Sequence, residues 1–81
     1  MNLVQQAIAE IAYGAAHAGI TMKMKDLSNE LKKQGVNPGE KRGLFKQVST
    51  TYDQAMAEGN KGVAKNIADV FTDDNGNHYW E

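Results

Sequence analysis

The sequence predicts a mainly α-helical fold: one compact domain, residues 1–81, of three or four helices closed by a short C-terminal β-hairpin. The chain has 81 residues, which suffices for one hydrophobic core and no more. Apolar residues recur at the three- and four-residue spacing of a helix face through most of its length. Near the C-terminus, Asn75-Gly76 is a strong signal for a tight hairpin turn.

The first helix is expected from Leu3 to His17. Its apolar residues follow one face of a helix, and the pattern stops at Ala18-Gly19, where glycine accepts the left-handed conformation common at a helix C-terminus. The opposite side is only partly polar, so this helix is expected to be covered from two sides, and a partner could supply the second cover. The next residues, 20–23, fit either a short strand or a plain connection.

The second helix is expected from Met24 to Gln34, because Met24, Leu27 and Leu31 share one face. Gly35-Val36 then supplies the glycine and the apolar residue of a Schellman ending. A turn should therefore separate this helix from the next one.

The third helix has the clearest start signal in the chain, at residues 37–40. Asn37 is expected at the N-cap, Pro38 at the first helical position and Glu40 at N3, where its side chain can reach back to the cap. The helix should continue to about Glu58. Its predicted buried face consists of Leu44, Phe45, Val48, Tyr52, Ala55 and Met56, and its predicted outer face of Arg42, Lys46, Ser49 and Asp53.

Residues 63–71 admit two interpretations. Val63, Ile67 and Val70 fit one face of a short helix, which we favour, whereas the same residues alternate only imperfectly as a strand. The Asn-Gly turn that follows predicts a hairpin whose aromatic end, residues 78–80, packs back on the helices. If 63–71 were extended, the whole tail would form one longer hairpin.

The charges are unevenly distributed along the chain. The net charge is only −1, so no overall field attracts the protein to nucleic acid. Between Lys23 and Lys46, however, there are seven basic residues and three acidic ones, whereas from Gln47 onward there are two basic residues and six acidic ones. The positive segment coincides with the second helix, the turn and the first half of the third helix.

The position of the basic residues around this turn and helix start is the observation that indicates a function. Proteins that dock a helix in the DNA major groove present the start of that helix to base edges, while neighbouring residues contact phosphates. Arginine can bind guanine through its planar fork, and lysines neutralise phosphates. We therefore predict a DNA-binding or transcription-regulatory module that docks helix 38–58 in the major groove of double-stranded DNA. The predicted contact residues are Lys32, Lys33, Lys41, Arg42, Lys46, Ser49 and Thr50.

The layout also resembles the winged-helix branch of the helix-turn-helix proteins. The features that carry the resemblance are a first helix, the segment 26–31 within the second helix, a short turn, a longer helix and a terminal hairpin with Asp74-Asn75-Gly76 at its tip. The resemblance implies a helix-turn-helix fold with a small β wing, and DNA as the partner. Because the tip is acidic, at Asp73 and Asp74, it is expected to point away from DNA.

Two other interpretations stay open. The charges of segment 23–46 are also explained as the solvated sides of two surface helices. Alternatively, the chain is a non-catalytic protein-interaction module, such as a small accessory protein or mobile-element regulator, that uses the apolar face of helix 3–17. A homodimer is compatible with either function, because a domain of this size buries a limited share of its surface.

No catalytic, metal or cofactor motif is recognisable. His17 and His78 lack the spacing of a metal site, no glycine-rich phosphate loop is present, and no nucleophile can be paired with a base. We expect a non-enzyme with no cofactor, no metal ion and no small-molecule substrate. Phe71, Tyr79 and Trp80 fit core packing better than a stacking surface for single strands. No charged leader or membrane-spanning stretch is recognisable, so a cytoplasmic location is expected.

Overall fold

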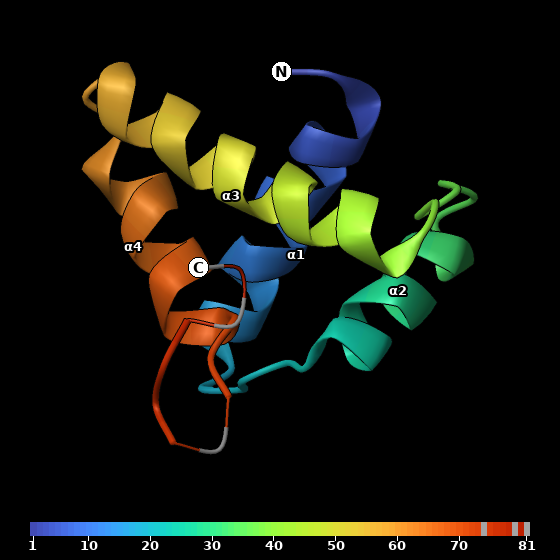
Figure 1. Cartoon of the computed structure of the whole chain (residues 1–81). Helices are drawn as coiled ribbons and strands as arrows, with labels where there is room; N and C mark the ends of the chain where they lie inside the picture. The colour runs from blue at the N-terminus through green and yellow to red at the C-terminus, as the bar shows by residue number, and fades with distance from the viewer. Residues whose placement is uncertain (74, 79, 81) are drawn as a thin grey trace.

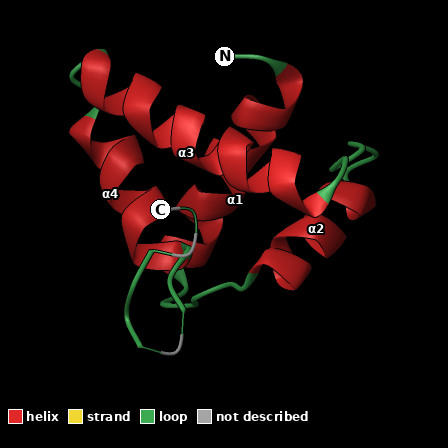
Figure 2. Cartoon of the chain, viewed as in Figure 1, coloured by secondary structure: helices red, strands yellow, loops and turns green. Residues whose placement is uncertain are grey.

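The computed structural model describes residues 1–73, 75–78 and 80, which contain four helices (Figure 1). They are α1 (Leu3–His17), α2 (Met24–Lys33), α3 (Lys41–Ala57) and α4 (Lys61–Val70). The mainly α-helical fold class is confirmed, and among the described residues Figure 2 shows helices and loops without a strand. Within the same residues, no helix is both long and apolar enough to cross a lipid bilayer.

Helix α1 lies at the centre of the domain and packs against each of the other three helices. Its buried face combines isoleucine with alanine, and Ile8 and Ala12 are completely buried. The small alanine side chains let neighbouring helices approach closely, while the isoleucines fill the space between them. The second cover expected for this helix is thus supplied by the chain's own helices. Fully or almost fully buried around it are Leu27, Leu31, Leu44, Val48, Ile67, Val70 and Phe71.

The predicted Schellman ending of α2 is confirmed, but the helix ends at Lys33, one residue before the predicted Gln34. The N–H of Val36 donates to the carbonyl of Leu31 at 2.9 Å, and the N–H of Gly35 donates to the carbonyl of Lys32 at 3.0 Å, which is the Schellman pattern. Gly35 has a φ of 74°, the left-handed conformation that favours glycine. The chain therefore turns away from α2 at a fixed angle after Lys33.

Helix α3 does not begin at Pro38, as the sequence predicts, but at Lys41. The side-chain oxygen of Asn37 accepts a hydrogen bond from the N–H of Gly39 at 2.9 Å, so it stabilises a turn and not a helix end. Gly39 itself has a φ of 71°. A left-handed residue cannot belong to a right-handed helix, so regular helix starts only after it, with Glu40 as the N-cap.

The buried face of α3 agrees with the prediction at Leu44, Val48 and Ala55, but not at its last turn. Met56 is 49% exposed, and Thr51, which the prediction left out, is completely buried. The Thr51 hydroxyl donates to the carbonyl of Gln47 at 2.6 Å, and this bond satisfies a polar group that burial would otherwise penalise. Phe45 and Tyr52 are half-buried at the edge of the core.

Residues 61–70 form a helix, as favoured from the sequence, and Asn60 caps it by accepting from the N–H of Val63 at 3.3 Å. The predicted β-hairpin and wing are wrong for the described residues, where a single antiparallel bridge joins Thr72 to His78. Two backbone hydrogen bonds also hold the intervening turn, from the N–H of Asp73 to the carbonyl of Asn77 at 2.7 Å and from the N–H of Gly76 to the carbonyl of Asp73 at 3.0 Å. Side-chain hydrogen bonds to Asp73 add to them. The tip residue Asp74 lies outside the described residues.

The aromatic C-terminal end packs back on the helices, as predicted for Phe71 and Trp80. Phe71 is completely buried and Trp80 is 9% exposed. The Trp80 ring lies 5.7 Å from the Tyr52 ring and stacks on the His78 imidazole at 4.5 Å, measured between ring centroids. These rings close one end of the core, whereas Tyr79 lies outside the described residues.

The two glycines that flank the start of α3 should respond oppositely to alanine. Gly39→Ala should lower the free energy of unfolding by about 1–2 kcal/mol, because a Cβ disfavours the left-handed conformation. Gly43→Ala should raise it by up to about 1 kcal/mol, since Gly43 is inside the helix. A Cβ meets no atom within 4 Å at either position. Urea denaturation followed by circular dichroism measures both; stabilisation by both substitutions would contradict the turn at Gly39.

Candidate nucleic-acid interface

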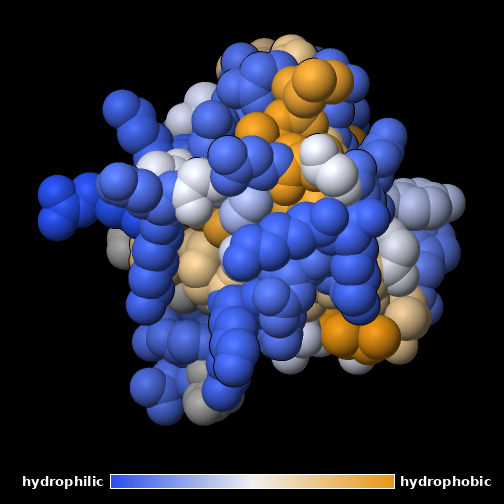
Figure 3. All heavy atoms as spheres, turned by 90° about the vertical axis from the view of Figure 1, so that its right-hand side faces the viewer, coloured by the Kyte–Doolittle hydropathy of each residue, from blue (hydrophilic) through white to orange (hydrophobic). Residues whose placement is uncertain are grey.

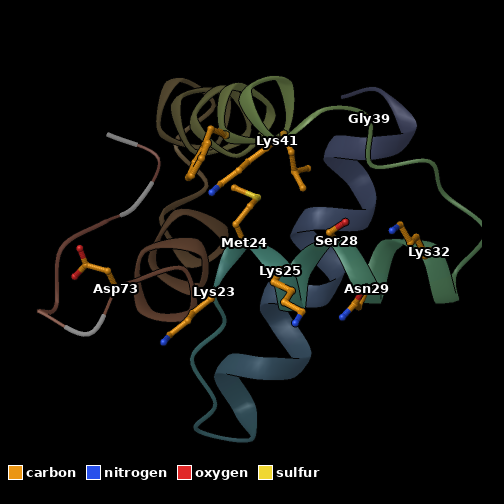
Figure 4. A pocket seen from close by; sticks show the side chains of 11 residues that line it. Lys23, Met24, Lys25, Ser28, Asn29, Lys32, Gly39, Lys41 and Asp73 are labelled. Carbon is orange, nitrogen blue, oxygen red and sulfur yellow. The ribbon is translucent and has the colours of Figure 1, made fainter.

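A cleft of about 720 Å³ separates α2 from the start of α3 (Figure 4). Helix α2 packs on α1, and its other side faces the first turns of α3 across this cleft. The left-handed Gly39 lies in its wall, at the point where the chain arrives from α2. The lining residues are Lys23, Met24, Lys25, Ser28, Asn29, Lys32, Gly39, Lys41, Leu44, Phe45 and Asp73.

Four lysines stand around this cleft. Lys23, Lys25 and Lys32 come from α2 and the residue before it, and Lys41 is the first residue of α3. Lys25, Lys32 and Lys41 are exposed, and none of the three forms an ion pair with a residue that the structure describes. Positive charges gathered around one concave surface raise its potential more than the same charges scattered over a convex surface. The described residues that line the cleft thus include four lysines and one carboxylate, Asp73.

The interior of the cleft is apolar. Met24 and Leu44 are buried at its base and Phe45 is half-buried beside them. In Figure 4, the side chains of Met24 and Lys41 extend toward each other from α2 and α3. The Lys41 ammonium lies 5.9 Å from the centroid of the Phe45 ring, within the range of a cation–π contact. The cleft thus combines a cationic rim with an apolar floor.

Asp73 is the one carboxylate among the described residues that line the cleft. Its side-chain oxygen accepts hydrogen bonds from the N–H groups of Asn75 and Asn77, each at 2.9 Å, so the turn holds it in place. The sequence predicts that the acidic tip points away from DNA, and the structure places Asp73 among the residues that line the cleft. Asp73 reduces the positive potential at one end of the cleft.

The structure divides the predicted DNA-contacting residues between two surfaces. Lys32 and Lys41 line the cleft. Arg42 and Lys46 are exposed on the side of α3 opposite the buried Leu44, as the prediction of an outer face requires. Of the remaining three, Lys33 is paired with Glu30 at 3.2 Å, and Ser49 and Thr50 are both half-buried.

The prediction missed Lys23, Lys25 and Phe45 as members of a site. A sequence signal for part of the set exists, because Lys25, Ser28 or Asn29, and Lys32 recur at the spacing of one polar helix face. The sequence predicts Phe45 as a core residue, because half-buried and buried aromatic residues follow the same periodicity. These residues become neighbours only in the folded chain, where α2 and the start of α3 lie on either side of the cleft.

The side of the molecule that carries α2 and the start of α3 is mainly hydrophilic. Figure 3 shows hydrophilic side chains covering most of this face, with hydrophobic surface visible between them. The apolar face of α1, which a protein-interaction module would use, is instead occupied by the chain's other helices. The large apolar side chains of α1 that remain exposed are Leu3, 76% exposed, and Tyr13, 58% exposed on the side of the helix opposite the apolar face.

Within the described residues, no three histidine, cysteine or acidic side chains come together as a metal site. His17 contacts the carbonyl of Tyr13 through Nδ1 at 3.0 Å, and His78 is stacked on Trp80. Comparison with known proteins identifies no matching family model, curated protein or solved structure. The function must therefore be argued from the cleft and the outer face of α3.

The two hydrogen bonds that the Asp73 side chain accepts within its turn can be tested by hydrogen exchange. Asp73→Ala should accelerate exchange of the Asn75 and Asn77 amides about three- to tenfold, which corresponds to a hydrogen bond of ~0.5–1.5 kcal/mol. Asp73→Asn should accelerate it less, because the amide retains an accepting oxygen. Equal exchange in the alanine variant and the unmodified protein, measured by NMR, would show that the two bonds do not hold the turn.

Proposed function

We propose that the chain is a small DNA-binding module, with α3 docked in the major groove of duplex DNA and α2 on the neighbouring phosphate backbone. The observation that carries this proposal is the convergence of Lys23, Lys25, Lys32 and Lys41 on one cleft at the start of α3. Phosphate contacts supply most of the affinity of such modules and fix their orientation, whereas base contacts supply specificity.

The outer face of α3 supports the same geometry. Arg42 and Lys46 are one turn apart and exposed, and Ser49 follows on the next turn. These are side chains that bind guanine, phosphate or either. Asp53, exposed one turn further on, would repel phosphates. Contact is therefore expected from the first half of α3 only, with its second half leading away from the duplex.

The connection between the two helices differs from that of a typical helix-turn-helix. Seven residues, 34–40, separate α2 from α3, whereas the usual turn has three or four residues. The longer connection and the left-handed Gly39 hold α2 away from α3 and open the cleft. In the proposed complex, α2 contacts the backbone with its own lysines while α3 enters the groove independently.

Binding to duplex DNA should weaken steeply with salt, and Lys46→Ala should flatten that dependence. Loss of one phosphate contact reduces the slope of log K against log [salt] by about 0.9. Fluorescence anisotropy of a labelled duplex, titrated at several salt concentrations, measures the slope.

The matched control for this experiment is Lys61→Ala, which removes an exposed lysine at the start of α4. Its slope should equal that of the unmodified protein. An equal change of slope in both variants would reveal unspecific attraction, and no binding at low salt would contradict the proposed function itself.

A further inference from the structure

The apolar floor of the cleft is not explained by contact with duplex DNA. The phosphate backbone offers charge and hydrogen-bond acceptors, and the bases of a duplex are stacked and paired inside it. Lysines alone would be enough to bind the phosphates of duplex DNA. Met24, Leu44 and Phe45 instead give the cleft a hydrophobic base beneath its cationic rim.

The dimensions of the cleft match a small organic ligand. Its volume of about 720 Å³ lies within the roughly 300–1,000 Å³ of typical small-molecule sites. Such sites are mostly apolar, with a few polar groups that orient the ligand. Here the polar groups on the wall are Ser28, half-buried on α2, and its exposed neighbour Asn29.

The rim and the floor together define the chemistry of that ligand. Lysines line both sides of the cleft, Lys25 and Lys32 on α2 and Lys41 on α3. Several cations around one ligand suit a phosphate group better than a single carboxylate. An aromatic residue beside a cationic groove is the combination by which proteins hold unpaired bases. The side-chain amide of Asn29 carries the donor and acceptor pair that matches the edge of adenine.

We propose that this cleft binds one unpaired nucleotide, with its phosphate among the lysines and its base against Met24, Leu44 and Phe45. The lysines of the rim also belong to the phosphate contact proposed for duplex DNA, whereas the apolar floor does not, since a base within a duplex cannot reach it. The nucleotide comes from one of two sources with the same chemistry, a free mononucleotide or a single strand of nucleic acid.

The test is a titration of the ¹⁵N-labelled chain with adenosine 5′-monophosphate, followed by amide chemical shifts. Saturable shifts are expected in residues 23–32 and 39–45. Adenosine alone and inorganic phosphate alone should each bind at least tenfold more weakly, because each uses only half of the site. An eight-nucleotide oligoadenylate in a parallel titration identifies the source: binding by the oligonucleotide with little binding of the monophosphate assigns the site to single strands.

Two variants separate the rim from the floor. Lys25→Ala should weaken monophosphate binding about three- to tenfold by removing one cation, and Phe45→Leu should weaken it similarly while retaining an apolar side chain that preserves the fold. Lys61→Ala, on α4, should leave it unchanged. Phe45→Leu should also leave duplex binding unchanged, so loss of the nucleotide site can be distinguished from loss of duplex binding.

The proposal is overturned if neither the monophosphate nor the oligonucleotide gives saturable shifts in these residues. Equal binding of inorganic phosphate and the monophosphate would overturn it as well, since the floor would then be unused. The same holds if these amides respond only to an acidic peptide that carries a phenylalanine, which would make the cleft a peptide site.

Discussion

The structure depends on the burial of α1 at the centre of the domain. Three helices pack on this one helix, and alanines such as Ala12 make room for them where larger side chains would hold them apart. Because α2 packs on α1, with Leu27 and Leu31 in the common core, it does not need to close against α3. The open space between α2 and α3 is thus a consequence of how the core is assembled.

The C-terminal segment completes this arrangement and shapes one end of the cleft. The N–H of Met22, just before α2, donates to the carbonyl of Val70 at the end of α4 at 2.7 Å. This bond joins the entry of α2 to the exit of α4. The turn that follows is anchored by the buried Phe71 and Trp80, and it places Asp73 beside the lysines. The packing of Phe71 and Trp80 that stabilises the fold therefore also positions a negative charge, Asp73, at the cleft.

Much of the fold could be predicted from the sequence because the relevant signals are local. The periodicity of α1 and the glycine at the end of α2 each depend on a few neighbouring residues. The start of α3 was mispredicted because Asn37 and Pro38 suit a turn as well as a helix cap, and Gly39 decides between the two. The hairpin was mispredicted because the Asn-Gly signal specifies a turn, whereas a strand ladder needs partners along its length. The site was predicted in part, since charge density is visible in sequence but the distance between α2 and α3 is not.

We propose that the cations around the α2–α3 cleft form the surface on which this chain binds nucleic acid. The most direct measurement is a map of amide chemical shifts as unlabelled duplex DNA is added to the ¹⁵N-labelled protein at low salt. Shifts are expected mainly in residues 23–32 and 39–46, with the exposed side of α4 unaffected. Shifts centred on α4 or on the exposed end of α1, or no shifts at all, would contradict it.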